Sequence, residues 1–327
     1  MSDEGEFDVI ARRLAPLSAG APGAAALSDD GALVDLDPGE TLAVTADTLI
    51  EGRHFPQGCE ARLAARKALR VNLSDLAAMG SRPFGYFLNI TWPPGGASAR
   101  AAGFVDGLRE DQARFGVRLL GGDTTCGPGP WAIAITALGR RPAGLALRRN
   151  GARPGDALVA TGTFGDAGLG LRMLQGEDLG LDAKARAFLE SRSLTPAPRL
   201  EALAAMRRHA RAAIDVSDGL LADARHLALG SDLHLDIALE ALAVSGPAAA
   251  WLAGQDDEAA GRLQLASSGD DYELLLAAPR PDALIAELAQ AGLEAGVIGR
   301  FSAGPGAVSV TWRSTRLAPE VWGFTHF

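Results

Sequence analysis

The sequence contains little lysine, little cysteine and no long apolar run. Its two lysines, Lys67 and Lys184, lie in neither a G-x-x-x-x-G-K-[ST] loop nor a V-A-I-K strand, which excludes the common lysine-based ATP sites. The two cysteines, Cys59 and Cys126, form no CxxC pair and no disulfide framework, as is typical of a reducing cytoplasm. No apolar run reaches the roughly 18 residues of a membrane-spanning helix, so we expect no membrane contact.

The chain is also poor in positive charge, with 31 basic and 40 acidic residues and a net charge of −9. A nucleic-acid binder needs a basic face for the phosphates, so we expect no nucleic-acid partner. A polyphosphate ligand would need intervening cations or locally concentrated arginine. Residues 1–6 are acidic and lack the order of a signal peptide, so we expect a cytoplasmic protein.

A length of 327 residues with 47% hydrophobic residues favours two folded domains. Strand-like and helix-like segments alternate along the chain, which predicts an α/β (α+β) fold. The first set has strands at 41–47, 84–92, 117–120 and 131–138, with helices at 59–79 and 98–115. The second has strands at 157–161, 212–216, 233–237, 272–277, 296–301 and 307–312, with helices that include 219–229 and 281–291. A Pro-, Gly- and Arg-rich connection at 139–156 separates them, and we predict domains at 1–145 and 146–327.

Seven aspartates stand at predicted strand ends or in tight turns, in the segments SDDGA (28–32), TADT (45–48), NLSD (72–75), GGDTT (121–125) and DVSDGL (215–220). Each alone is explained by the preference of Asp for turns and helix N-caps. Together they favour magnesium, which prefers oxygen ligands and binds polyphosphates. Strand carboxyl ends are also where open α/β sheets bind ligands.

Three further features suggest ligand contacts, and each has a structural alternative. Gly121 and Gly122 follow a predicted strand, where glycine allows a phosphate close to the backbone but also suits a plain turn. Arg148 and Arg149 suit phosphate oxygens, although such a pair is more often a solvated linker. Acids at 270–273 and aromatics at 322–327 together suit a flat cationic ring, although terminal aromatics often only pack.

These segments, together with DTLIEGRHF (47–55), VNLSDLAAMG (71–80), SGDDYELL (268–275) and the terminal WGFTHF, resemble the thiamine-monophosphate kinases. That family belongs to the aminoimidazole-ribonucleotide-synthetase-like ATP-binding superfamily. The resemblance implies a two-domain synthetase-like fold in which N-terminal strands of two subunits form a barrel-like dimer core. It also implies transfer of the ATP γ-phosphoryl group to thiamine monophosphate, which gives thiamine diphosphate, in a homodimer.

The resemblance also implies roles for individual residues. The magnesium ligands would be Asp30, Thr45, Ala46 through its carbonyl, Asp47, Asp75, Asp123, Asp215 and Asp218. The ATP contacts would be Gly122, Asp123, Arg149 and Ser217. The thiamine side would be His54, Asp271 or Glu273, and Trp322 or Phe324. The family usually has glycine where Ser28 stands and a hydroxyl residue where Ala46 stands.

No general base is needed, because a phosphate monoester is largely a dianion near pH 7 and is already nucleophilic. Catalysis is then expected to rest on positioning and on charge neutralisation by several Mg²⁺ ions. A sibling enzyme of the superfamily and a nucleotide sensor without transfer activity remain alternatives. Selenophosphate synthetase would need a reactive cysteine near the N-terminus, and none precedes Cys59.

Overall fold

The computed structural model describes residues 6–145 and 147–325, and contacts between Cα atoms divide the chain into two units. Unit 1 is Met1–Leu76 with Ser81–Gly144, and unit 2 is Ala77–Gly80 with Leu145–Phe327. Each unit has one β-sheet with helices packed against it, so the predicted two-domain α/β class is confirmed. The predicted domain boundary at residue 145 lies beside this division.

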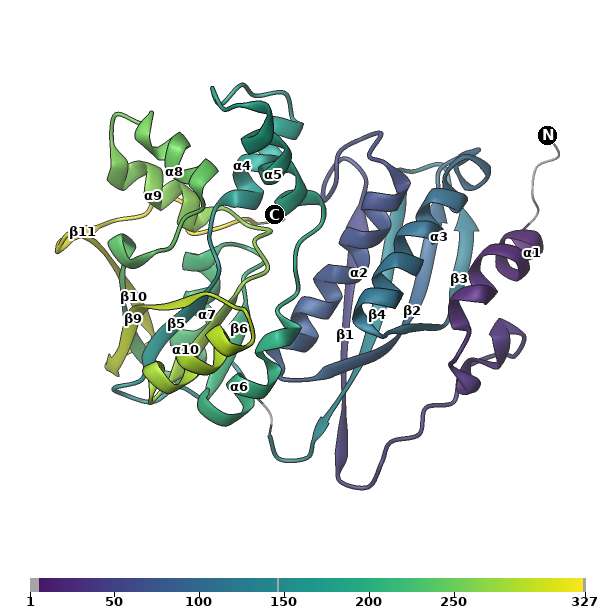
Figure 1. The fold of residues 1–327 in the computed structure, drawn as a ribbon, viewed down its shortest axis with the longest axis horizontal. Coiled ribbons are helices and arrows are strands. Elements are labelled where there is room, and N and C mark those ends of the chain that lie inside the picture. The colour runs from purple at the N-terminus through teal and green to yellow at the C-terminus, as the bar shows by residue number, and fades with distance from the viewer. Residues whose placement is uncertain (1–5, 146, 326–327) are drawn as a thin grey trace. The chain divides into compact units, whose positions relative to one another are not determined.

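Unit 1 contains a four-stranded sheet in the order β1-β4-β2-β3. Its strands are β1 (Glu40–Ile50), β2 (Arg82–Trp92), β3 (Arg118–Cys126) and β4 (Ala132–Pro142). Helices α2 (Ala61–Ala78) and α3 (Gly96–Phe115) lie across one face of the sheet (Figure 1). The sheet of the single chain is open, and the predicted barrel-like core, which would combine the strands of two subunits, stays a prediction.

The opposite face of this sheet is covered only in part. The segment before β1 comprises α1 (Glu6–Val9) and the short turns Ile10–Leu14, Ala15–Ser18 and Pro22–Leu27. Its Ala24 packs with Leu120 of β3 and Leu138 of β4. On the edge strand β1, alternate side chains point the same way, and Leu42 and Val44 remain 37% and 56% exposed.

Unit 2 contains a seven-stranded mixed sheet in the order β11-β10-β7-β9-β5-β8-β6. The strands are β5 (Ala157–Thr161), β6 (Ala212–Asp215), β7 (Leu233–Ala238), β8 (Leu274–Ala278), β9 (Ala295–Ala303), β10 (Ala307–Trp312) and β11 (Thr315–Leu317). The helices are α4 (Asp166–Leu174), α5 (Ala183–Leu194), α6 (Leu203–His209), α7 (Leu220–Ser231), α8 (Gly246–Ala253), α9 (Glu258–Ser267) and α10 (Pro281–Gln290). Apolar clusters lie on both faces, because the central strands β5 and β8 are buried along their whole length.

Two local predictions were wrong. Gly121 and Gly122 are strand residues of β3 rather than a turn after it, because β3 continues to Cys126 beside β2. Gly122 has φ +146°, and a Cβ there would stand 1.8 Å from the carbonyl oxygen of Leu88, so only glycine fits. The expected connection at 139–156 also starts later, since β4 runs to Pro142.

The chain end differs from expectation as well. Trp322 and Phe324, two residues apart, would face the same side if the terminal segment were a strand. Residues 318–325 form no strand, so alternation does not apply to them. His326 and Phe327 lie outside the described residues. No helix within residues 6–145 and 147–325 is both long and apolar enough to cross a bilayer.

Candidate functional site

The clearest acidic cluster of unit 1 joins strand β1 to helix α2. Thr45 and Asp47 are alternate residues of β1, so both side chains point to the helix-covered face. Thr45 Oγ1 donates to Asp75 Oδ2 of α2 at 2.5 Å. The pKa of Asp47 is raised to about 7, first by burial, then by the charge of Asp75 and a hydrogen bond to it.

This cluster has the chemistry that a magnesium ion requires. Asp47 and Asp75 are two repelling carboxylates with a hydroxyl beside them, and a bound cation would remove the cost of keeping both charged. Mg²⁺ is commonly held by one or two carboxylates, with water and substrate phosphates as the other ligands. Among the described residues no group of three or more His, Cys, Asp or Glu is placed to hold a metal without such help. Ala46 points to the opposite face and is exposed.

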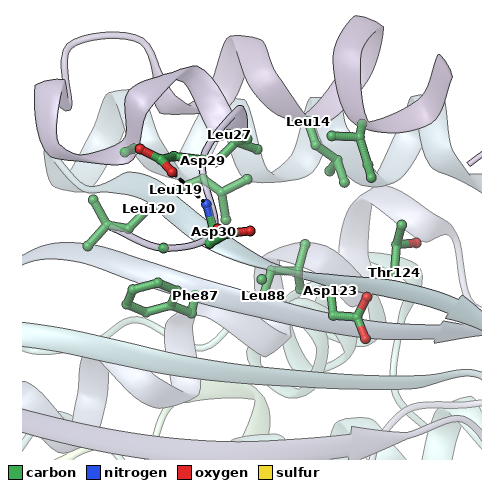
Figure 2. Close-up of a pocket in the computed structure, with 15 residues that line it drawn as sticks. Leu14, Leu27, Asp29, Asp30, Phe87, Leu88, Leu119, Leu120, Asp123 and Thr124 are labelled. Carbon is green, nitrogen blue, oxygen red and sulfur yellow. Dashed lines mark hydrogen bonds between the residues drawn. The ribbon is translucent and has the colours of Figure 1, made fainter. Parts of the chain in front are cut away.

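A second group of predicted residues lines a pocket at the other side of unit 1. The pocket has a volume of about 250 Å³ and lies between the N-terminal segment and strands β2 and β3 (Figure 2). Asp30, Gly122 and Asp123 line it, with Leu14, Leu27 and Phe87 among its apolar walls. The Asp30 backbone N–H donates to Asp29 Oδ1 at 2.9 Å. The pocket therefore combines carboxylates with a larger apolar surface.

The sheet register separates these two groups. Asp47 pairs with Ile135, Ile135 with Leu88, and Leu88 with Gly122. Asp47 and Gly122 thus lie in one row on opposite edge strands, three strand spacings or about 14 Å apart. Asp123 follows in the next row, so its side chain points to the face opposite Asp47. Unit 1 by itself does not bring the predicted ligands Asp47, Asp75, Asp30 and Asp123 together.

His54 lies in the turn that follows β1. Its backbone N–H donates to the carbonyl of Ile50, and its Nδ1 accepts a hydrogen bond from the Ile50 N–H at 3.0 Å. With Nδ1 occupied as an acceptor, the neutral ring carries its proton on Nε2. Both contacts to Ile50 fix the orientation of the His54 ring at the end of β1.

In unit 2, the predicted residues Asp215, Ser217 and Asp218 lie where β6 ends and α7 begins. Sequence reasoning missed Asp223, one turn into α7, which is 3% exposed. Its Oδ2 accepts the N–H groups of both Ser217 and Asp218 at 3.1 Å. Burial, followed by the charge of Asp218, raises the pKa of Asp223 to about 7. The sequence feature that could have indicated Asp223 is an acidic residue in the first turn of a helix that follows an Asp-rich loop.

Arg149 lies close to this loop. Its charge acts to lower the pKa of Asp223, and its side chain is exposed. Its backbone carbonyl accepts a hydrogen bond from Ser231 Oγ at 3.1 Å, which ties the segment to the end of α7. A cationic side chain beside Ser217 and Asp218 is what an ATP phosphate would need.

Asp271 and Glu273, predicted on the thiamine side, are both fully buried. Asp271 accepts the N–H groups of Gly165 and Ala167 at 2.7 and 3.2 Å, at the start of α4. Burial raises the pKa of Asp271 well above its usual value. Glu273 binds Arg192 at 2.8 Å and also Arg199 and Thr161. The hydrogen-bond partners that the structure shows for the Asp271 and Glu273 carboxylates are thus protein groups. Contact of either residue with the substrate stays a prediction.

The aromatics near the chain end have different surroundings. Trp322 packs against the core of unit 2, and the guanidinium of Arg225 lies 5.7 Å from its ring. Phe324 is 42% exposed, and its N–H donates to the carbonyl of Asp218 at 2.8 Å. Of the two, Phe324 is the more exposed, and its backbone lies next to the Asp215–Asp218 loop.

Both halves of the chain match known family models. Residues 28–141 match the N-terminal domain of AIR synthase related proteins, and residues 153–311 match the C-terminal domain. These matches cover most of the chain, and the N-terminal domain precedes the C-terminal domain. The chain belongs to the AIR synthase related proteins.

More specific relatives lie within this family. The chain is 44% identical to the thiamine-monophosphate kinase of Caulobacter vibrioides over 98% of this chain and 90% of that protein. The crystal structure of thiamine-monophosphate kinase from Stenotrophomonas maltophilia K279a has a TM-score of 0.78 and 38% identity, covering 87% and 89% of the two chains. AaThiL complexed with AMPPCP and TMP has a TM-score of 0.76 and 27% identity, covering 100% and 98%. Within the AIR synthase related proteins, the chain is a member of the thiamine-monophosphate kinases.

Proposed function

We propose that this chain catalyses ATP-dependent phosphorylation of thiamine monophosphate to thiamine diphosphate. The observation that carries the proposal is near full-length similarity to thiamine-monophosphate kinases, including one with 44% identity. A related structure is complexed with AMPPCP and TMP, a pair that corresponds to a phosphoryl donor and an acceptor. The Asp-rich loops of both units carry the motifs that such a donor site would use.

The chain's own residues would act by positioning rather than by proton transfer. Asp47, Asp75 and Thr45 supply oxygen ligands in unit 1, and Asp215 and Asp218 supply them in unit 2. Magnesium bound by these groups would neutralise the phosphate charges of donor and acceptor. Arg149 and Ser217 would contact ATP, and His54 would line the thiamine side.

A direct assay tests the activity. Purified protein, ATP, Mg²⁺ and thiamine monophosphate should yield thiamine diphosphate and ADP in equal amounts, measured by chromatography. Formation of ADP without thiamine diphosphate would contradict the proposal and favour the activity of another enzyme of the superfamily. ATP binding without turnover would favour a nucleotide sensor. The co-substrate ATP fits the cytoplasmic location that we predicted.

We also propose that the enzyme is a homodimer whose sites use residues from both copies. Two features of unit 1 support this. Leu42 and Val44 are exposed on an edge strand beside the partly uncovered sheet face, where a second sheet would bury them. The Asp47–Asp75 pair and the Asp30–Asp123 pocket lie on opposite edges of the sheet, so a second copy could supply what one unit 1 cannot bring together.

Mixing two inactive variants tests a shared site. Asp47→Asn and Asp123→Asn are purified separately, then mixed and allowed to exchange subunits. If Asp47 of one copy works with Asp123 of the other, mixed dimers contain one intact site, and activity recovers to about a quarter of wild type. No recovery in a mixture that has exchanged subunits would mean that each chain builds its own site. A monomer mass by light scattering at micromolar concentration would contradict the dimer itself.

A further inference from the structure

The last described residues of the chain are tied to the loop that carries Ser217 and Asp218. Residues 321–324, here called the tail, are held at two points. Ser267 Oγ donates to the carbonyl of Val321 at 2.8 Å. The N–H of Phe324 donates to the carbonyl of Asp218 at 2.8 Å. Side chain and backbone donors therefore fix the tail at both of its ends.

Gly323 allows the tail to approach this closely. A Cβ on Gly323 would stand 2.6 Å from the Cβ of Ala222 and 2.6 Å from the carbonyl oxygen of Asp218. Both distances are well inside ordinary van der Waals contact, and the obstacles are backbone or a short side chain of α7 that cannot move away. Any side chain at 323 would lift the tail from the loop.

The loop is held from other directions as well. The Asp223 carboxylate accepts the N–H groups of Ser217 and Asp218. The N–H of Asp270 donates to the carbonyl of Ser217 at 2.8 Å. The tail adds the donor for the carbonyl of Asp218. The peptide groups of the loop are thus fixed, while the side chains of Ser217 and Asp218 stay half-buried and accessible.

We propose that the tail is a positioning element for Ser217 and Asp218, and that Gly323 is the residue that makes this possible. The inference rests on the proposed function, in which this loop holds magnesium and ATP. It gives the tail two separable roles. Its backbone orients the metal side of the site, while the ring of Phe324, which is 42% exposed, would contact the acceptor.

Three variants and a control separate these roles. Gly323→Ala displaces the tail, and Ser267→Ala removes one of its two anchors. Phe324→Ala keeps the backbone N–H and removes only the ring. Gly296→Ala of β9 is the matched control, because a Cβ at Gly296 meets nothing within 4 Å. Melting temperatures identify any variant that is simply unfolded.

Two quantities are measured: the Mg²⁺ concentration at half-maximal rate, and the affinity for Mg²⁺–AMPPCP by calorimetry, which needs no turnover. We expect Gly323→Ala to weaken both about fivefold, the factor that corresponds to one ordinary hydrogen bond, and Ser267→Ala to weaken them less. Phe324→Ala should leave both unchanged and raise only the KM for thiamine monophosphate. Gly296→Ala should match the wild type.

The proposal is overturned if Gly323→Ala matches Gly296→Ala in both quantities, because the tail would then only cover the core. If Gly323→Ala does not fold, the proposal is overturned when Ser267→Ala matches Gly296→Ala in both quantities. A wild type that binds Mg²⁺–AMPPCP but forms no thiamine diphosphate refutes the proposed function alone, and calorimetry still tests the tail. A wild type that does not bind Mg²⁺–AMPPCP refutes both.

Discussion

Replacing Glu273 by glutamine tests whether this residue is structural. Its carboxylate is fully buried and binds both Arg192 and Arg199, whose side chains are 14% and 18% exposed. Thr161 Oγ1 also donates to it, at 2.8 Å. Glutamine preserves the volume, but it removes the charge and turns an NH₂ group toward the two guanidinium groups. Arg199 would then lose its hydrogen-bonded counter-ion, and Arg192 would keep only the longer 3.7 Å contact with Asp166.

The expected loss follows from that geometry. Breaking a buried ion pair by removing one partner costs about 3–5 kcal/mol, and the slight exposure of both arginines favours the lower end, about 3 kcal/mol. Urea unfolding followed by circular dichroism measures the change in the free energy of unfolding. The matched control is Glu190→Gln, which loses an i,i+4 pair with the half-exposed Arg186 and should cost about 0.5 kcal/mol or less.

One result would refute this reasoning. If Glu273→Gln is as stable as Glu190→Gln while its KM for thiamine monophosphate rises, then Glu273 contacts the substrate rather than the arginines. The structure predicts the reverse, a large loss of stability with little change in KM at temperatures where the variant is folded.

Three further perturbations have defined outcomes. Asp47→Asn and Asp75→Asn should each abolish turnover, because each removes a charged ligand of the proposed Mg²⁺ site; near-normal rates at limiting Mg²⁺ would contradict the cluster. Neither should lower the melting temperature, because burial and the charge of Asp75 raise the pKa of Asp47 and each substitution removes a charge from this pair. Gly122→Ala should destabilise the protein by about 3 kcal/mol or more, measured by urea unfolding, because its Cβ would overlap the neighbouring strand; a stable variant would show that β3 bends away. Burial raises the pKa of Cys59 to about 11, so its thiolate is about a thousandth of the total at pH 8. Its alkylation rate should therefore rise about tenfold per pH unit up to that pKa, as followed by mass spectrometry, while the exposed Cys126 reacts first. Equal rates of the two cysteines at pH 8 would contradict the raised pKa of the half-buried Cys59.

The residue pattern by itself predicted the class of fold and most of its elements. Strands β5 and β10 have the predicted bounds. Helices α2 and α3 begin and end within a few residues of the bounds predicted for these helices. Local rules suffice there: short apolar runs, long alanine-rich segments and glycine after a helix depend only on neighbouring residues. The motif order along the whole chain also predicted the family. Those motifs identify chemistry without depending on how the chain packs.

Tertiary packing decided what local rules cannot see. Gly121 and Gly122 read as a turn, yet pairing with β2 extends the strand through them. Asp271 or Glu273 was predicted on the substrate side, and only the fold showed that Arg192 and Arg199, more than 70 positions away in the chain, bind the carboxylate of Glu273. Asp223 lies in none of the predicted site motifs, and only the fold brings its carboxylate within hydrogen-bond distance of the N–H groups of Ser217 and Asp218. A sequence reports which groups a chain carries, whereas register and long-range contacts determine which of them meet.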